Sequence, residues 1–399
     1  MNEGKYVFTQ VLRFLPRQIF SRLVKKYKGD YRTREFNCSN QLRYLLFGQL
    51  TACNSLRDIC LCLKAHKDIL YGLGITTSVH ESSLSRANET RDYRIFEGLG
   101  LALIKEVRPK YSKTRVDYLY SQEHEIFALD STTISCSIKL MEWAVGKYSK
   151  GAVKMHTLID LRGSIPAFIY ISDGRCHDSN VLDMLDIVPR AIYTMDKAYV
   201  DFKALARIDS EEGIFITRAK DNMKYEIASS NFNIDETTGV IGDHMIRLTG
   251  LKTQKLYPKE LRMIVFHDYE TDEQLTFISN ATDVLLFNGL EIANVYRHRW
   301  DIEVFFKFCK QNLTIKHLWG HSENAVKTHL WVAICAYLLL AKIKVVYNSP
   351  FSITEIATLV SVSALMKTDL QALVTDPQPE LPTLFSDQDV NELNLFNNF

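Results

Sequence analysis

The spacing of apolar residues divides the chain into a helical first part and a mixed remainder. Up to about residue 110, apolar positions recur every three or four residues, as at Phe8, Val11 and Leu15, and this predicts amphipathic helices. One of them begins within HESSLSRANETRDYRIFEGL, where we expect Ser82 or Ser83 to be the cap. Short helices that start with Ser, Arg and Asn are typical of helix-turn-helix DNA readers, but a plain helical bundle has the same pattern.

From about residue 120 the pattern changes to short apolar runs separated by turns. Two helices, at 178–188 and 199–208, are predicted between the later runs, which makes the order βββαβαβ. Strands that alternate with helices indicate an α/β fold. The expected strands are EIFALD (125–130), VKMHTLIDL (153–161), PAFIYIS (166–172), AIYTMD (191–196) and GIFITRA (213–219).

The remaining part of the chain, from residue 221 on, is predicted to contain an insertion, two helices and a tail. The polar, strand-rich stretch 221–285 indicates a β-rich insertion. YRHRWDIEVFFKFCKQ, from Tyr296 to Gln311, has no proline or glycine and is expected to be one helix. The apolar stretch 330–341 is too short to span a bilayer and predicts a buried helix. We therefore divide the chain into 1–115, 120–345 and 346–399.

Charge and composition change this picture in two places. The 399 residues carry a net charge of only +1, but Met1 to Arg34 contains nine Lys or Arg and two acids, whereas 370–399 contains five acids and no cation. A basic start favours DNA binding, although an uneven solvated surface is the plainer alternative. The eight cysteines have no framework spacing, so we expect free thiols in a cytosol, with no membrane partner. No glycine-rich phosphate loop is present, so ATP is not implied.

Two predicted neighbouring strands end in a carboxylate, Asp130 and Asp196. An aspartate after an apolar run is usually a turn or cap residue. Ligands, however, gather at the carboxyl ends of strands in α/β sheets, and paired carboxylates there favour Mg²⁺ or Mn²⁺. His177 and Asp178, after the third strand, suggest an acid–base pair, but a helix cap at Asp178 is the favoured interpretation.

One face of the helix 296–311 adds a third carboxylate between cations. A ladder of Arg and Lys binds phosphates, and a carboxylate within it can hold a metal ion against the same phosphate. The alternative is a surface helix with ion pairs such as Glu303 with Lys307. Arg218 and Lys220, just after the fifth strand, are further phosphate candidates. The polar stripe consists of Tyr296, Arg299, Glu303, Lys307 and Lys310, and the apolar residues Ile302, Phe305, Cys309 and Leu313 face another way.

The spacing Y-x2-R-x3-E-x6-K in this stripe resembles the signature of DDE transposases of the insertion-sequence 4 family. ALDSTTIS around Asp130 resembles the first-Asp block of that family, and YTMDKAYVD around Asp196 resembles the second. ISDGRCHDS (171–179) resembles the segment between them. The resemblance covers about 120–345.

This resemblance implies a ribonuclease-H-like catalytic core with a β-rich insertion, preceded by a helical N-terminal DNA-binding region. Asp130, Asp196 and Glu303 would be the catalytic carboxylates and the ligands of two Mg²⁺ (or Mn²⁺) ions. Tyr296, Arg299 and Lys310 would grip the DNA backbone, and Lys307 shares their stripe.

The function that the resemblance implies is cut-and-paste transposition by two-metal-ion phosphoryl transfer. The partners would be the terminal inverted repeats of the protein's own insertion sequence and the target DNA, held by a homodimer on the bacterial chromosome. A metal-dependent nuclease on the same fold and a catalytically decayed DNA-binding protein are the alternatives.

One feature departs from the family. Members that cut the second strand through a hairpin place a Trp of the insertion against a flipped base, but 197–295 contains no Trp. Another aromatic ring would have to stack there. The candidates are Phe215, Tyr225, Tyr257, Phe266 and Tyr269.

Overall fold

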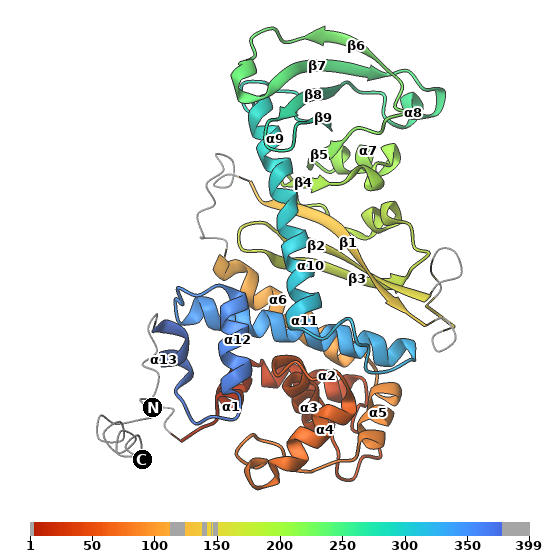
Figure 1. Cartoon of the computed structure of the whole chain (residues 1–399). Coiled ribbons are helices and arrows are strands. Elements are labelled where there is room, and N and C mark those ends of the chain that lie inside the picture. Colours follow the sequence, from red (N-terminus) through yellow and green to blue (C-terminus); the bar gives the residue numbers. More distant parts are fainter. Residues whose placement is uncertain (1–3, 112–123, 138–141, 145, 147–150, 377–399) are drawn as a thin grey trace, which may run out of the picture.

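A nine-stranded sheet and a body of helices lie one above the other in the computed structural model (Figure 1). The structure describes residues 4–111, 124–137, 142–144, 146 and 151–376. The predicted boundary near 115–120 and the acidic tail after residue 376 lie outside these residues. The prediction of a mixed α/β fold is confirmed.

Helices from both ends of the sequence form the helical body. Val7 N–H donates to Met366 O at 2.9 Å, so the first helix packs beside the last ones, as Figure 1 shows. The helices are α1 (Val7–Val11), η1 (Leu12–Phe14), α2 (Arg17–Lys26), α3 (Cys38–Leu50), α4 (Leu56–Ala65), η2 (Lys67–Ile69), α5 (Glu81–Thr90), α6 (Arg94–Tyr111), α11 (Glu323–Val346), α12 (Ile353–Ser363) and α13 (Leu370–Thr375).

Helix α5 differs from the predicted DNA-reading helix in two respects. Its cap is the ring of His80, whose Nδ1 accepts from the Ser82 N–H, so the expected cap at Ser82 or Ser83 is wrong. Asn88 is buried and accepts a hydrogen bond from Gln41 at 2.8 Å. Its amide is therefore used for packing between α3 and α5.

The predicted buried helix 330–341 lies within α11. This helix is long and apolar enough to cross a membrane, but residues 330–341 are at most 3% exposed and the helix packs against α3, α5 and α6. Helix α11 is therefore the core of the helical body, and the prediction is confirmed. All eight cysteines of the chain are free thiols.

The central part of the sheet has the predicted order βββαβαβ. Strands β1, β4 and β5 are parallel, and β2 and β3 pair antiparallel beside β1. The first predicted helix, 178–188, is instead a shorter 3-10 helix. The elements are β1 (Ile126–Cys136), β2 (Gly151–Asp160), β3 (Ile165–Asp173), η4 (Asp178–Met184), β4 (Ile192–Met195), η5 (Lys197–Tyr199), α7 (Phe202–Ser210) and β5 (Ile214–Arg218).

The β-rich insertion extends this same sheet, because β5 pairs antiparallel with β9. The whole strand order is β3-β2-β1-β4-β5-β9-β8-β7-β6. Strand β6 was not predicted; it is an edge strand whose residues are mostly exposed, so no apolar alternation marks it. The insertion contains β6 (Tyr225–Ser230), η6 (Glu236–Thr238), β7 (Val240–Leu248), α8 (Leu251–Leu256), β8 (Leu261–Asp268) and β9 (Glu273–Ser279).

A helical rod crosses the sheet from the insertion to the helical body (Figure 1). It consists of α9 (Gly289–Arg297), η7 (His298–Trp300) and α10 (Asp301–Asn312). Asn288 and Glu291 form a capping box at its start. The expectation of one uninterrupted helix is wrong at 298–300, where a 3-10 step turns Arg299 towards β1.

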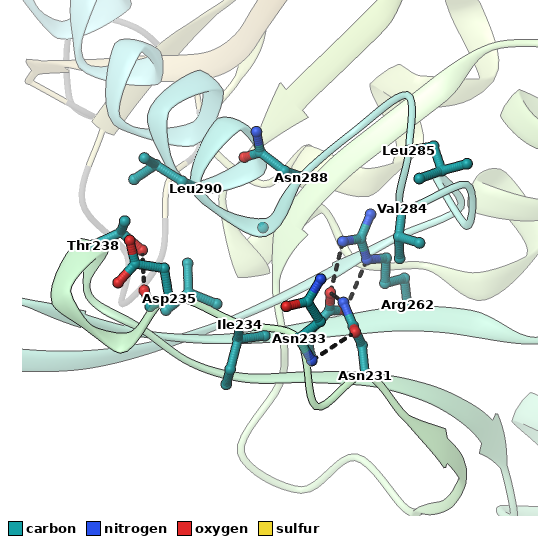
Figure 2. Close-up of a pocket in the computed structure, with 13 residues that line it drawn as sticks. Asn231, Asn233, Ile234, Asp235, Thr238, Arg262, Val284, Leu285, Asn288 and Leu290 are labelled. Carbon is teal, nitrogen blue, oxygen red and sulfur yellow. Dashed lines mark hydrogen bonds and ion pairs between the residues drawn. The ribbon is translucent and has the colours of Figure 1, made fainter.

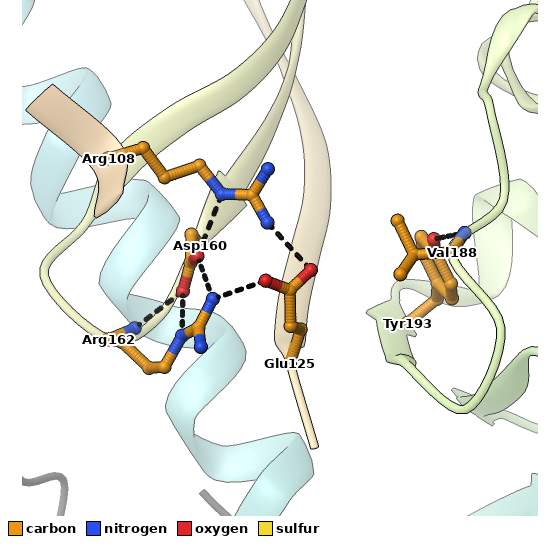
Figure 3. Close-up of polar contacts among 6 residues, drawn as sticks. All are labelled: Arg108, Glu125, Asp160, Arg162, Val188 and Tyr193. Atoms are coloured by element: carbon orange, nitrogen blue, oxygen red, sulfur yellow. Dashed lines mark hydrogen bonds and ion pairs between the residues drawn. The ribbon is translucent and has the colours of Figure 1, made fainter. Parts of the chain in front are cut away.

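A charged cluster connects α6 of the helical body to the sheet (Figure 3). Asp160, at the end of β2, is 3% exposed and accepts hydrogen bonds at 2.9 Å from Arg108 and Arg162. Both arginines also bind Glu125, each at 2.8 Å. Burial raises the pKa of Asp160, but the two guanidinium groups outweigh burial and hold it below its usual value.

We expect Asp160→Asn to lower the free energy of unfolding by about 1–3 kcal/mol, because two guanidinium groups lose an ionised partner. A carboxyl whose folded pKa is lowered stabilises the protein above its unfolded pKa of about 3.9, and this contribution is lost as the pH falls below that value. Urea unfolding at pH 7 and at pH 3 measures both effects. Equal stability of the variant and the unsubstituted protein at pH 7 would contradict this account.

Candidate active site

The first two predicted carboxylates stand side by side on parallel strands. Leu129 pairs with Met195 as the last register pair of β1 and β4, and Asp130 and Asp196 each follow directly. The prediction that the first strand ends at Asp130 is wrong, because β1 continues to Cys136 against β2. Asp130 therefore lies inside a strand, at the point where its neighbour β4 has ended.

Arg299 joins the rod to these strands. Its Nη1 donates to Asp130 Oδ2 at 3.1 Å and its Nη2 donates to Glu303 Oε1 at 3.2 Å. The arginine side chain is 11% exposed and lies over the ring of Tyr296, 5.6 Å from its centroid. Glu303 thus pairs with Arg299 rather than with Lys307, the partner expected for an ordinary surface helix.

Like charges crowd this site. Burial raises the pKa of Asp130, and the nearby carboxylates of Glu303 and Asp196 raise it further, against the opposing effects of the Ser131 N–H and Arg299. Burial also disfavours the charge of Arg299, but Tyr296 and the three carboxylates outweigh burial and raise its pKa. The site therefore carries more negative than positive charge, and binding of a cation would lower the electrostatic free energy of the site.

A cleft of about 350 Å³ opens beside the carboxylates. Asp130 and Glu303 line it together with Lys307, Lys310 and Lys316. Among the described residues, none of the three lysines has a carboxylate partner within 4 Å, and Lys316 lowers the pKa of Lys310, after the larger effect of burial. Lys316 follows the end of α10 in a loop, where no helical spacing signals it. A cleft with unpaired cations next to carboxylates suits a phosphate chain.

The other predicted DNA-binding residues differ from one another in exposure and in contacts. Tyr296 is 8% exposed and packs against Phe277, with ring centroids 4.7 Å apart. Its ring is therefore held in place and forms the surface over which the Arg299 guanidinium lies. Arg218, at the end of β5, is half-buried. The Lys220 ammonium donates to Val200 O at 2.7 Å and so ties the segment after β5 to the segment that follows Asp196.

A second polar layer lies behind Asp130. The Ser131 hydroxyl donates to Asp178 at 2.8 Å, and Lys154 pairs with the same carboxylate at 2.9 Å. Asp178 belongs to the first turn of η4 but makes no side-chain cap there, so the helix-cap interpretation is wrong. Its carboxylate holds the residue next to Asp130 instead.

A larger cavity, of about 410 Å³, lies in the insertion and away from the carboxylates (Figure 2). Its lining is mainly amides and apolar side chains around the buried Arg262, without the mixture of carboxylates and free lysines that phosphate chemistry requires. The smaller cleft is therefore the better candidate for an active site.

Three of the five aromatic rings proposed to stack on a base are unavailable. Phe215, Tyr257 and Phe266 are at most 5% exposed, whereas Tyr225 and Tyr269 are 41% and 66% exposed. Phe232 is 90% exposed and Trp300, beside Arg299, is 61% exposed. Both offer more free ring surface than the three buried candidates.

The residues present fit a divalent cation. All three donors are carboxylates, the hard oxygen ligands that Mg²⁺ and Mn²⁺ prefer. A cationic group, the Arg299 guanidinium, already bridges two of them. Among the described residues, no three Asp, Glu, His or Cys side chains are gathered closely enough to hold an ion as they stand, and Arg299 bridges two of the candidate ligands, Asp130 and Glu303.

Carboxylates on neighbouring strands and on a crossing helix suit the binding of divalent cations. The chain belongs to the family of transposases with a DDE domain, whose model matches residues 121–339, more than half of the chain. A family described as a domain of unknown function matches residues 3–76. The prediction of a DDE transposase of the insertion-sequence 4 type is thereby confirmed.

Individual relatives agree with this family. The chain is 29% identical over 271 residues to a probable transposase for insertion sequence element IS5377 of Geobacillus stearothermophilus, covering 68% of each protein. It is 28% identical over 267 residues to a putative transposase for element IS4SA of Synechocystis, covering 66% of this chain and 71% of that one. Among solved structures it resembles the piggyBac transposase synaptic complex with hairpin DNA, at 11% identity and a TM-score of 0.46 over 95% of this chain and 84% of that chain.

Proposed function

We propose that this transposase binds the terminal inverted repeats of its own insertion sequence and moves that element by cut-and-paste transposition. The observation that carries the proposal is the site itself: Asp130, Asp196 and Glu303 around one arginine, beside a cleft with three unpaired lysines. The core would be ribonuclease-H-like, spanning about 120–345, and the active form on DNA a homodimer that holds two element ends.

Each group of residues has a distinct task in this proposal. Asp130, Asp196 and Glu303 would hold two Mg²⁺ or Mn²⁺ ions, which activate the attacking oxygen and stabilise the leaving oxygen. Lys307, Lys310 and Lys316 would neutralise the DNA backbone along the cleft. Ser131, Asp178 and Lys154 would keep the strand at Asp130 fixed, so that this carboxylate is already in position for catalysis.

The proposal is tested with the DNA that flanks the gene. End-labelled fragments containing each element boundary are incubated with the full chain and Mg²⁺ or Mn²⁺, together with unlabelled target DNA. We expect metal-dependent 3′-hydroxyl ends at the boundaries and joined products in the target. Cuts without joining would instead indicate a metal-dependent nuclease, and binding without cuts would indicate a decayed protein.

Helix α2 is the surface that we propose for the first contact with DNA, within the region 1–115. It exposes Arg22, Lys25 and Lys26, and none of these pairs with a carboxylate within the described part of the chain. The outward face of α5 offers only short side chains and Arg86 beside two glutamates, since Asn88 is buried. Backbone contacts from a basic helix provide affinity without reading sequence.

Replacing Arg22 and Lys25 by Gln is expected to weaken DNA binding and to flatten its dependence on salt. Each lost phosphate contact lowers the slope of log K against log [salt] by about 0.9, so the double variant should lose roughly 2. Fluorescence anisotropy with a labelled duplex at several salt concentrations measures the slope. Lys105 and Lys110, exposed on α6, are the matched control pair, and an equal loss in both variants would contradict a contact specific to α2.

A further inference from the structure

One side chain occupies the position that the metal chemistry requires to be free. Arg299 uses Asp130 Oδ2 and Glu303 Oε1 as its two hydrogen-bond acceptors. A guanidinium that bridges the two carboxylates fills the space in which a cation between them would lie, and two cationic groups so close together repel each other. In the arrangement seen here, binding of a cation between these residues therefore excludes the arginine.

The environment of Arg299 favours this resting position only in part. The side chain is 11% exposed, and its Nε is buried without a hydrogen-bond partner among the described residues. A buried donor without an acceptor costs free energy. The guanidinium group that bridges the two carboxylates therefore has one hydrogen-bond donor, Nε, that is not used. A better acceptor for the whole guanidinium group would draw it away.

The adjoining cleft is where such an acceptor would arrive. Asp130 and Glu303 line the cleft, and the other charged side chains in its lining are Lys307, Lys310 and Lys316. An arginine that moved into this space alone would meet cations, which repel it. A phosphate held by the lysines reverses that repulsion, because phosphate accepts a guanidinium fork as well as a carboxylate does.

We propose that Arg299 is the counter-ion of the site in the free protein, and that it leaves Asp130 and Glu303 for a DNA phosphate when a divalent cation binds. This inference rests on the proposed function of the three carboxylates. By linkage, DNA then tightens cation binding, and the cation tightens DNA binding by the same factor. In the free protein, Arg299 competes with a cation for Asp130 and Glu303 and so weakens cation binding, which disfavours cutting of DNA that does not reach the cleft.

The experiment is a Mn²⁺ titration of the full chain, with free Mn²⁺ followed by electron paramagnetic resonance. In the absence of DNA, Arg299→Gln is expected to bind Mn²⁺ about tenfold more tightly than the unsubstituted protein, the change that loss of one competing charged hydrogen bond produces. Adding a short DNA duplex should tighten binding by the unsubstituted protein and leave Arg299→Gln unchanged. Arg297→Gln is the matched control, because Arg297 is two residues away and pairs with Asp268 at 3.7 Å.

Two further variants separate the possible failures. Arg299→Lys keeps the charge but cannot bridge both carboxylates with one fork, so it should show intermediate tightening even if the Gln variant does not fold. Asp130→Asn should lose Mn²⁺ binding. If both Arg299 variants bind Mn²⁺ as tightly as the unsubstituted protein or more weakly, and Asp130→Asn does not bind Mn²⁺, only the counter-ion role is overturned. Unchanged binding by Asp130→Asn would overturn the proposed function as well.

Discussion

Asp130→Asn is expected to abolish metal-dependent DNA cleavage while leaving DNA binding intact. The substitution keeps the shape of the side chain but removes one negative ligand from the three carboxylates that we propose hold the cations. Loss of several kcal/mol of transition-state stabilisation lowers the rate by on the order of a thousandfold or more. Single-turnover cleavage of an end-labelled element boundary in Mg²⁺ measures the rate, and anisotropy with the same DNA in the absence of divalent cations measures binding.

Asp178→Asn is the informative comparison for this result. Asp178 contacts Ser131 and Lys154 but does not line the cleft, so its loss should slow cleavage far less than the loss of Asp130. If the two variants cut at the same reduced rate, the assignment of Asp130 as a ligand and Asp178 as its support is wrong. Weakened DNA binding by Asp130→Asn would equally count against a purely catalytic role.

Asp243→Asn is expected to destabilise the protein by about 3–5 kcal/mol, because it leaves a buried arginine without an ionised partner. The Arg262 and Asp243 side chains are 1% and 4% exposed and are joined by two bonds of 2.8 Å. Arg262 also donates to Phe287 O and Ala281 O, in the segment that leads into α9. The pair therefore anchors the start of the rod that carries Glu303, at the edge of the cavity in Figure 2.

The urea midpoint measures this loss, and two variants show whether burial is its cause. Arg247 and Glu260 form an exposed pair in the same insertion, with the arginine 59% exposed, and Arg247→Gln should cost less than about 1 kcal/mol. Replacing Arg262 and Asp243 together by Met and Leu should recover much of the stability, since no buried charge remains. A small effect of Asp243→Asn, equal to that of Arg247→Gln, would refute the argument.

Each of the three candidate carboxylates has a local signal in the sequence. Asp130 and Asp196 follow apolar runs, and Glu303 stands in a polar stripe at helical spacing. The stripe could not show which cation Glu303 binds, because Arg299 and Lys307 are both four residues away. Which cation pairs with Glu303 is decided by Asp130, which precedes Arg299 by 169 residues in the sequence. Arg299 is the cation that reaches this carboxylate as well as Glu303.

The features of the structure that could not be predicted from the sequence have no periodic pattern of residues. Lys316 reaches the cleft from a loop, and the contact of Asp178 with Ser131 joins different elements, so neither spacing nor propensity marks that lysine or that contact. Strand β6 lies at an exposed edge, where side chains have no buried face to alternate with. The 3-10 step at 298–300 occurs in a stretch without proline or glycine, so no residue type marks it, and it contacts β1.

The contact between the two ends of the chain has a consequence for biosynthesis. Gln10 on α1 binds the backbone of Thr368 and Leu370, and Val7 binds that of Met366. Helix α1 therefore cannot make these contacts until the C-terminal segment has been synthesised, which takes roughly 20–70 s at about 5–20 residues per second. Phe8 of α1 can pack on Phe47 of α3 earlier, but the contacts with residues 366–370 cannot form before then. The helical body is completed only after the catalytic sheet has been synthesised, so a truncated product would lack its finished first segment.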